Sequence, residues 1–276
     1  HTTFFKDIYM NDKVCIVTPF HKSSLNESEK LSLKTIQKHF KNEKKFLVTF
    51  DENKIDLPNF ERINFSKIFF ENIQGYNNLC TSAEFYRSFL DFEYMLICQL
   101  DVIVLKNDLS EFISKNISYI GAPTGKKSPF DRSRKKLWGR RYFCNGGFSL
   151  RRTNDFIKVL ESSKIGYPFN YLTIYECLKS GFYRYIKLYL KTLFSKNIYK
   201  GESFAKNLYI KEDSFWTYFA PLFYKKYSLP TIDQANSFCF DGNPNFFYKM
   251  NKYKLPMALH GPFDYLKFLE KLNIQI

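Results

Sequence analysis

The chain has 276 residues, of which 45% are hydrophobic, so it is long enough to bury the core of one large domain. No apolar run reaches the roughly 18 residues of a membrane span, and no signal pattern opens the chain. The six cysteines occur singly, without the spacing of metal ligands. We therefore expect a cytoplasmic protein with reduced thiols. The net charge of +15, with 20 Tyr and 31 Phe, indicates a surface that binds anions, such as nucleic acid, sugar-nucleotide phosphates or an acidic membrane face.

The first part of the chain alternates between strand-like and helix-like segments. Buried strands are expected at 13–20, 45–51 and 63–70, with an amphipathic helix over 28–40. The second of these strands ends in Asp51. This alternation predicts an α/β fold in which helices cover both faces of a parallel or mixed sheet.

A further helix is expected over 79–92, leading into a strand over 94–105 that a single carboxylate, Asp101, interrupts. Because an unpaired buried carboxylate costs several kcal/mol, a metal, a hydrogen-bond donor or water must meet Asp101. Ligands of open α/β sheets bind at the carboxyl ends of strands, so Asp101 and Asp51 would converge on one crevice. A simple turn role stays open for both aspartates.

The middle of the chain holds three ambiguous segments. After a strand at 118–123, residues 124–141 are rich in Lys and Arg and predict either a solvated basic loop or a lid that meets phosphates. Asn145, Gly146 and Gly147 allow close approach of a ligand to the backbone, but a hairpin turn would use them equally well. A helix over 173–196, basic on one face, fits either a membrane interface or packing on the protein's own core.

Two acidic residues and one histidine complete the candidate site. Glu212 and Asp213 precede aromatic residues, and such a pair either begins a helix or supplies a general base. His260 ends a short apolar run near the C-terminus. A lone histidine is usually structural, yet Asp101 is an obvious partner with which it could bind a metal.

Together these segments resemble a family of bacterial GT-A-like glycosyltransferase domains. The resemblance rests on the order and spacing of several motifs over residues 13–265, since no single motif is specific. The motifs are Gln-Leu-Asp at 99–101, Ile-Gly-Ala-Pro at 120–123, Asn-Gly-Gly-Phe-Ser-Leu-Arg at 145–151, Glu-Asp-x-Phe-Trp at 212–216 and His-Gly at 260–261, with supporting matches at 76–79 and 84–87.

The resemblance implies a fold and a reaction. The fold would be a single GT-A-like, Rossmann-like domain over 1–276, a mixed sheet flanked by helices, with a helical insertion at 166–208. The reaction would move a sugar from a nucleotide-sugar donor to a glycan or lipid-linked acceptor, as in bacterial capsule or lipooligosaccharide synthesis. An inverting displacement is favoured, with Asp213 as the base and Glu212 as the other candidate acid.

The resemblance also implies ligands. Asp101 and His260 would hold a divalent metal, Mn²⁺ or Mg²⁺. However, Gln99 replaces the first acid of the usual Asp-x-Asp motif, which weakens this expectation. Basic residues of 124–141 could instead neutralise the negative charge of the diphosphate. The remaining residues expected to contact the donor are Thr18, Pro19 and Asp51 at the nucleotide, Asn145, Gly146 and Gly147 at the sugar, and Tyr76, Asn77, Arg87 and Gln99.

Two other functions are compatible with the composition. A sugar nucleotidyltransferase would usually carry a Gly-rich basic loop after its first strand, and residues 17–21 do not form one. A nucleic-acid-binding protein would explain the charge, but no binding motif is present, so no nucleic-acid partner is expected. The acceptor and the basic helix instead predict a peripheral contact with the anionic inner face of the cell membrane.

Overall fold

A computed structural model describes residues 13–123, 144–165, 198–208 and 211–276. The basic segment 124–141, the helix expected over 173–196 and most of the insertion expected at 166–208 lie outside the described residues. At the end of that insertion, the described part forms β9 (Ile198–Lys200), which pairs with β8 (Ser163–Ile165), and α10 (Gly201–Leu208).

A six-stranded mixed sheet forms the centre of the molecule, in the order β3-β2-β1-β4-β7-β6. The first four strands in this order run parallel, and β7 is antiparallel to both of its neighbours. The strands are β1 (Val14–Pro19), β2 (Lys44–Thr49), β3 (Glu61–Asn64), β4 (Tyr94–Cys98), β6 (Tyr119–Pro123) and β7 (Cys144–Arg152). The expected mixed sheet flanked by helices is therefore confirmed.

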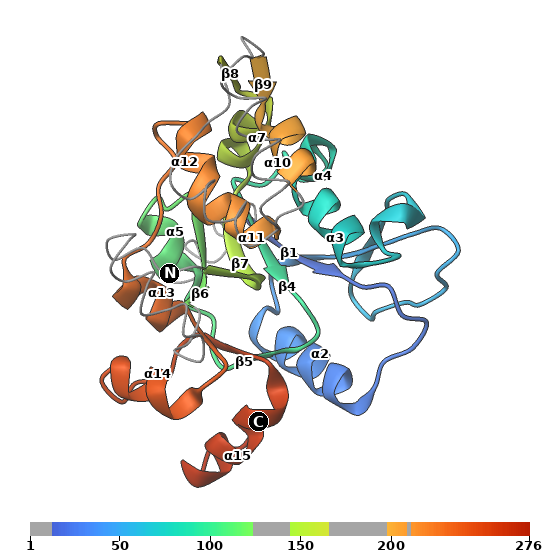
Figure 1. Cartoon of the computed structure of the whole chain (residues 1–276). Helices are drawn as coiled ribbons and strands as arrows, with labels where there is room; N and C mark the ends of the chain where they lie inside the picture. The colour runs from blue at the N-terminus through green and yellow to red at the C-terminus, as the bar shows by residue number, and fades with distance from the viewer. Residues whose placement is uncertain (1–12, 124–143, 166–197, 209–210) are drawn as a thin grey trace, which may run out of the picture.

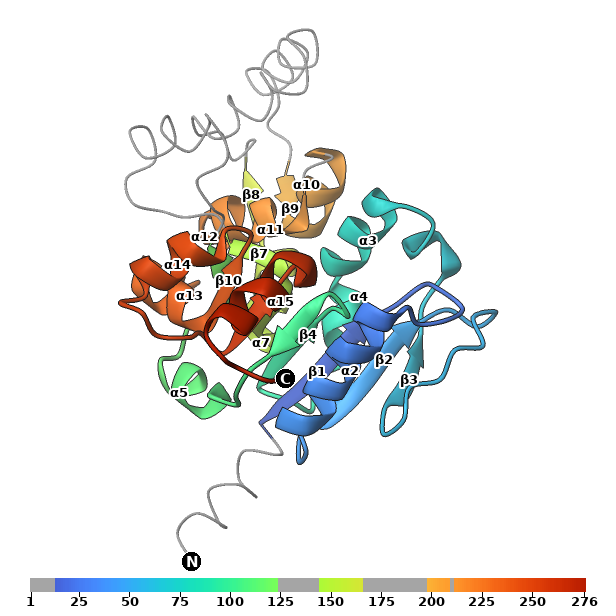
Figure 2. The same ribbon diagram turned by 90° about the horizontal axis from the view of Figure 1, so that it is seen from below.

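The alternation of side chains along β1 divides the core into two layers. Val14 and Ile16 pack with α2 (Glu27–His39), α5 (Leu109–Ser114) and α13 (Ile232–Phe238), whereas Cys15 and Val17 pack with the helices of the other face. Figure 1 shows α2 on one side of the sheet and the opposite layer on the other, and Figure 2 shows α2 lying across β1 and β2. The opposite layer contains α3 (Ile73–Cys80), α4 (Ala83–Arg87), α7 (Thr153–Glu161) and α12 (Ala220–Phe223).

The helix expected over 79–92 is wrong in its bounds, because hydrogen bonds to capping side chains begin two separate helices there. Asn72 accepts a hydrogen bond from the Gly75 N–H and begins α3, which ends at Cys80. Ser82 then accepts a hydrogen bond from the Phe85 N–H and begins the short α4. Side-chain caps of this kind satisfy the free N–H groups of a first turn.

Two expected strands are also shorter than the apolar pattern predicts. The strand expected over 63–70 ends at Asn64 and is followed by a 3₁₀ turn, η1 (Lys67–Phe69). The strand expected over 94–105 divides into β4 and β5 (Val102–Val104), which belong to different sheets. In the second sheet, β11 (Ala258–His260) pairs with both β5 and β10 (Cys239–Asp241) and so carries the C-terminal histidine to the turn between β4 and β5.

The other elements follow β9 and α10 along the chain. They are α11 (Glu212–Ser214), the π-helical turn η2 (Phe215–Phe219), α14 (Pro244–Met250) and α15 (Pro262–Lys271). None of the helices within the described ranges is long and apolar enough to cross a membrane. Five cysteines fall in these ranges, and all are buried and free, as expected.

Candidate functional site

The turn that follows β4 is fixed from two sides. The Gln99 N–H donates to the Gly147 carbonyl oxygen of β7 at 2.9 Å, and the Gly261 N–H donates to the Asp101 carbonyl oxygen at 2.9 Å. Residues 99–101 are thus held between β7 and the end of β11. Four strands of the main sheet end here or beside it, which is where open α/β sheets place ligands.

His260 lies between two carboxylates. Its Nε2 is 3.5 Å from Asp101 Oδ1, and its Nδ1 is 3.2 Å from Asp241 Oδ1. The buried Asp101 Oδ1 and His260 Nε2 face each other as an ion pair, and neither atom has a hydrogen bond to any other described group. Two facing polar atoms of this kind are where a cation, a water molecule or a ligand would be expected.

The electrostatics of this group favour positive charge. Burial alone would lower the pKa of His260, but the hydrogen bonds and charges of Asp101 and Asp241 outweigh it and raise that pKa to about 10. Burial would raise the pKa of Asp101, but the hydrogen bond and charge of His260, with a further contribution from Lys22, lower it. A metal would replace the proton on the imidazole.

Gly147 leaves the space in front of His260 open. A Cβ atom at this position would lie 2.5 Å from His260 Nε2 and 2.6 Å from Gln99 Oε1. The Gln99 amide, the His260 imidazole and the Asp101 carboxylate therefore converge over a bare stretch of backbone. Among the described residues no three His, Cys, Asp or Glu side chains are placed to hold a metal, so the third protein donor here would be the Gln99 amide.

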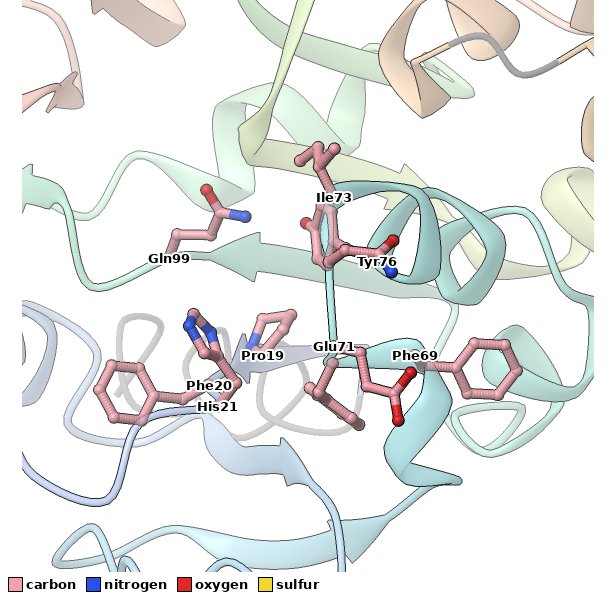
Figure 3. A pocket seen from close by; sticks show the side chains of 10 residues that line it. Pro19, Phe20, His21, Phe69, Glu71, Ile73, Tyr76 and Gln99 are labelled. Carbon is pink, nitrogen blue, oxygen red and sulfur yellow. The ribbon is translucent and has the colours of Figure 1, made fainter.

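A pocket of about 300 Å³ adjoins Gln99 at the carboxyl end of β1. Figure 3 shows Pro19, Phe20 and His21 on one side of it and Glu71 and Tyr76 on the other. Phe69, Phe70, Asn72 and Ile73 complete the lining. An aromatic wall with a few polar groups is typical of a pocket for a flat heterocycle.

Asn145 and Gly146 lie at the start of β7, next to this centre, but face different partners. The Asn145 amide accepts from the Gly147 N–H at 2.7 Å and donates to Asp241 Oδ2 at 3.3 Å. At Gly146 a Cβ atom would overlap Glu212 Oε1 and lie 3.0 Å from Arg151 Nη2. Asn145 thus belongs to the group around His260, whereas Gly146 makes room for a buried ion pair.

That ion pair joins Arg151 and Glu212 at 3.1 Å. The Arg151 side chain is fully buried, and it also donates to Ser149 Oγ at 2.9 Å and to Tyr86 Oη at 2.8 Å. The Glu212 N–H donates to Asn77 Oδ1 at 3.2 Å. The motifs at 76–79, 84–87, 145–151 and 212–216 therefore meet in one buried network, in which Glu212 and Asn77 have structural contacts.

Asp213 lies beside this network and is 9% exposed. Its Oδ1 accepts a hydrogen bond from the Ser214 N–H at 2.7 Å, as expected for an acid in a first helical turn. Burial, with a smaller effect of the Glu212 charge, raises the pKa of Asp213 to about 8. Burial also explains why a carboxylate can here hold a proton near neutral pH.

Three residues expected at the donor have contacts elsewhere. Thr18 is fully buried, and its hydroxyl donates to the Cys98 carbonyl oxygen at 2.9 Å, which joins β1 to β4. Asp51 is exposed and accepts from the Asn64 amide at 2.6 Å. Arg87 forms an exposed ion pair with Glu161, between α4 and α7. None of the three lines the pocket at the end of β1.

Asp241 and most of the pocket wall were not predicted from the sequence. Asp241 ends a three-residue strand, and its motif Phe-Asp-Gly resembles any turn. Its position beside His260 follows only from the parallel pairing of β10 with β11.

The aromatic residues at 69 and 70 in the pocket wall form a cluster in the sequence, but the sequence contains many such clusters, so this one gave no specific signal.

Comparisons with known proteins give one family and several similar folds. A family model described as "Protein of unknown function (DUF5672)" matches residues 59–260. The crystal structure of mouse xyloside xylosyltransferase 1, in its apo form, is 10% identical, with 91% of this chain and 98% of that chain covered and a TM-score of 0.48.

Two further structures have similar coverage of this chain. The galactosyltransferase LgtC, solved with donor and acceptor sugar analogues, is 12% identical, with 89% of this chain and 86% of that chain covered and a TM-score of 0.45. The apo glycosyltransferase GlyE of Streptococcus pneumoniae TIGR4 is 16% identical, with 91% of this chain and 54% of that chain covered and a TM-score of 0.40. No curated protein matches the sequence.

Proposed function

The chain belongs to the DUF5672 family of proteins of unknown function, and we propose that it is a glycosyltransferase that moves a sugar from a nucleotide-sugar donor to a glycan acceptor. One observation carries this proposal. Gln99, Asp101 and His260 converge over Gly147 at the carboxyl end of β4, directly beside an aromatic pocket that Gln99 also lines. A polar, cation-favouring centre next to an aromatic pocket matches a diphosphate joined to a nucleoside.

The donor set around His260 fits a divalent metal. Asp101 Oδ1 and His260 Nε2, which face each other and have no other hydrogen bond, would be ligands, and the Gln99 amide oxygen could be a third. Oxygen donors with one imidazole suit Mn²⁺, and to a lesser degree Mg²⁺. Such a metal, when bound, would neutralise the negative charge of the donor's diphosphate.

The aromatic pocket would bind the nucleobase. Phe20, Phe70 and Tyr76 offer ring faces or edges, and Glu71 and Asn72 offer polar groups for the edge of the base. Pro19, the last residue of β1, also lines this pocket. Its position supports the expected contact of Pro19 and Tyr76 with the nucleotide, and the sugar would extend toward Asn145 and Gly147.

Asp213 is the proposed base. Its raised pKa supports this role, because a base is most effective when its pKa is near the working pH. Asp213 would accept the proton of the acceptor hydroxyl while the hydroxyl oxygen forms a bond to the anomeric carbon. The bond from that carbon to the diphosphate breaks, and the diphosphate leaves with the electron pair. One such displacement inverts the anomeric configuration.

The acceptor is proposed to be a surface glycan, of the capsule or lipooligosaccharide type, built on a lipid. The net charge of +15 supports peripheral contact with an anionic membrane surface, on which such an acceptor would be found. Donor sugar and linkage depend on hydrogen bonds to individual hydroxyl groups.

A ligand panel tests the proposal. The melting temperature should rise with one or more sugar nucleotides in the presence of Mn²⁺, because ligands that bind the folded state stabilise it. Oligonucleotides of the same charge serve as the control and should cause no such rise. The matching nucleoside diphosphate should then be released when a glycan acceptor is added. Stabilisation by oligonucleotides alone would instead indicate a nucleic-acid-binding protein.

A further inference from the structure

Asp241 is the carboxylate on the far side of His260. It is the last residue of β10, and in the parallel pairing of β10 with β11 it lies directly opposite His260. The side chains of Asp241 and His260 are 23% and 12% exposed. Strand pairing therefore fixes the distance between the two residues without any contribution from a mobile loop.

Both carboxylate oxygens of Asp241 have a partner. Oδ1 is 3.2 Å from His260 Nδ1, and Oδ2 accepts from the Asn145 amide at 3.3 Å. Asn145 in turn accepts from the Gly147 N–H at 2.7 Å. A continuous chain of hydrogen bonds thus runs from the backbone of β7 through Asn145 and Asp241 to the imidazole ring.

The ring geometry has a consequence for the opposite nitrogen. When Nδ1 donates its hydrogen to Asp241, Nε2 points away from Asp241 and lies 3.5 Å from Asp101 Oδ1. A carboxylate that accepts the second N–H of a histidine fixes its tautomer and orientation and makes the ring a stronger ligand. Removing the carboxylate would remove the hydrogen bond that fixes the ring on its Nδ1 side.

We propose that Asp241 is a positioning residue, which holds His260 so that Nε2 and the Asp101 carboxylate face one cation site. This inference rests on the proposed function, because it assigns Asp241 to the same metal and diphosphate site. It adds a residue that touches neither the metal nor the donor. Asn145 acts with it by holding the second carboxylate oxygen.

Metal affinity is the first test. The Kd for Mn²⁺ can be measured by titration, with electron paramagnetic resonance reporting the free Mn²⁺. We expect this Kd to be 10–100-fold higher for Asp241→Ala than for the wild type, which is the usual effect of removing such a partner. Asp233→Ala is the matched control, since Asp233 is an exposed aspartate of the neighbouring α13. Its Kd should equal that of the wild type. If Asp241→Ala does not fold, Asp241→Leu, which likewise lacks an acceptor for the Nδ1 hydrogen, replaces it.

A measurement without metal separates this inference from the proposed function. The chain has four histidines, so the ring nitrogens of His260 can be assigned by ¹⁵N NMR with a His260→Gln variant. The Nδ1 proton of His260 should exchange slowly in the wild type and rapidly in Asp241→Ala. If the wild type binds no Mn²⁺ yet shows this difference, the metal site of the proposed function fails, and the orientation of the His260 ring by Asp241 stands without it. An unchanged Nδ1 proton in Asp241→Ala would overturn the positioning role, whatever the Kd.

Discussion

At the scale of single residues, the site depends on a few atoms that converge where β4 ends. Asp101 is the carboxylate on which the metal proposal depends, and its Oδ1 faces His260 Nε2 at 3.5 Å. Its side chain is half exposed, at a turn rather than in the packed core. Its chemistry and its contribution to folding are therefore separable by mutation.

Asp101→Asn should abolish sugar transfer while it changes the melting temperature by only a few degrees. The amide keeps the shape of the side chain but removes the charge that a divalent metal needs. Turnover with Mn²⁺ and a melting curve are the measurements. Full turnover of this variant, together with full activity of the wild type in a chelator, would refute the metal proposal.

The two neighbouring glycines give a matched pair of substitutions. Gly147→Ala should weaken donor and Mn²⁺ binding, because the new methyl group would lie 2.5 Å from His260 Nε2 and displace the ring. Gly146→Ala should instead lower the melting temperature, because its methyl group would overlap Glu212 and separate the ion pair with Arg151. Isothermal titration and thermal melts distinguish the two effects. The same response from both variants would contradict this division.

Asp213 should make stability depend on pH. Its pKa in the folded protein is about 8, well above the roughly 3.9 of an unfolded chain. Between these values the folded protein holds a proton that the unfolded chain has lost, so stability falls as the pH rises from about 4 to about 8. Asp213→Asn removes this effect. Its melting temperature, measured from pH 5 to pH 8, should exceed that of the wild type by more at the higher pH, whereas parallel curves would argue against the raised pKa.

The same variant also tests the catalytic role. Loss of one general base lowers turnover by about 10²–10⁴-fold, and we expect this for Asp213→Asn with little change in donor binding. Steady-state kinetics measure the loss of turnover, and the anomeric configuration of the product shows whether the displacement inverts it. A product that keeps the configuration of the donor would exclude the proposed single displacement.

At the scale of the elements, β7 and α11 are joined by the buried pair of Arg151 and Glu212. Arg151→Met should destabilise the fold by about 3–5 kcal/mol, because it leaves an unpaired carboxylate in the core. Chemical denaturation measures this loss. Arg152→Met is the adjacent control, since Arg152 pairs with Glu93 at 3.2 Å in a partly exposed position and should cost at most about 1 kcal/mol. If both variants lost the same free energy of unfolding, burial would not determine how much an ion pair contributes to stability.

At the scale of the whole molecule, the proposed lipid-linked acceptor and the net charge of +15 together predict membrane binding. The protein should sediment with anionic vesicles but not with neutral ones, since each basic residue near the surface contributes about 1 kcal/mol. Binding should weaken as salt rises, because charges are screened beyond about 8–10 Å near physiological ionic strength. Equal sedimentation with both lipids would contradict an electrostatic contact.

The sequence by itself determined the class of fold and proposed several residues of the candidate site. Alternating apolar strands and amphipathic helices are local patterns, and they predicted the mixed sheet, β1, α2 and β2 within a few residues. The isolated acid of residues 99–101 and the C-terminal His260 could be noticed because a charged or polar residue in an apolar run must have a partner. The motifs that surround Gly147 were identified instead by the resemblance of their order and spacing to a known family.

Only the tertiary structure decided which of these residues meet. The pairing of β11 with β5 brings His260 to Asp101, and the pairing of β10 with β11 adds Asp241. The same packing assigns Glu212 to Arg151 and directs Arg87 and Asp51 to partners away from the pocket. Strand pairing joins residues that are far apart in the chain, and short strands such as β10 and β11 carry too few residues to reveal their partners in the sequence.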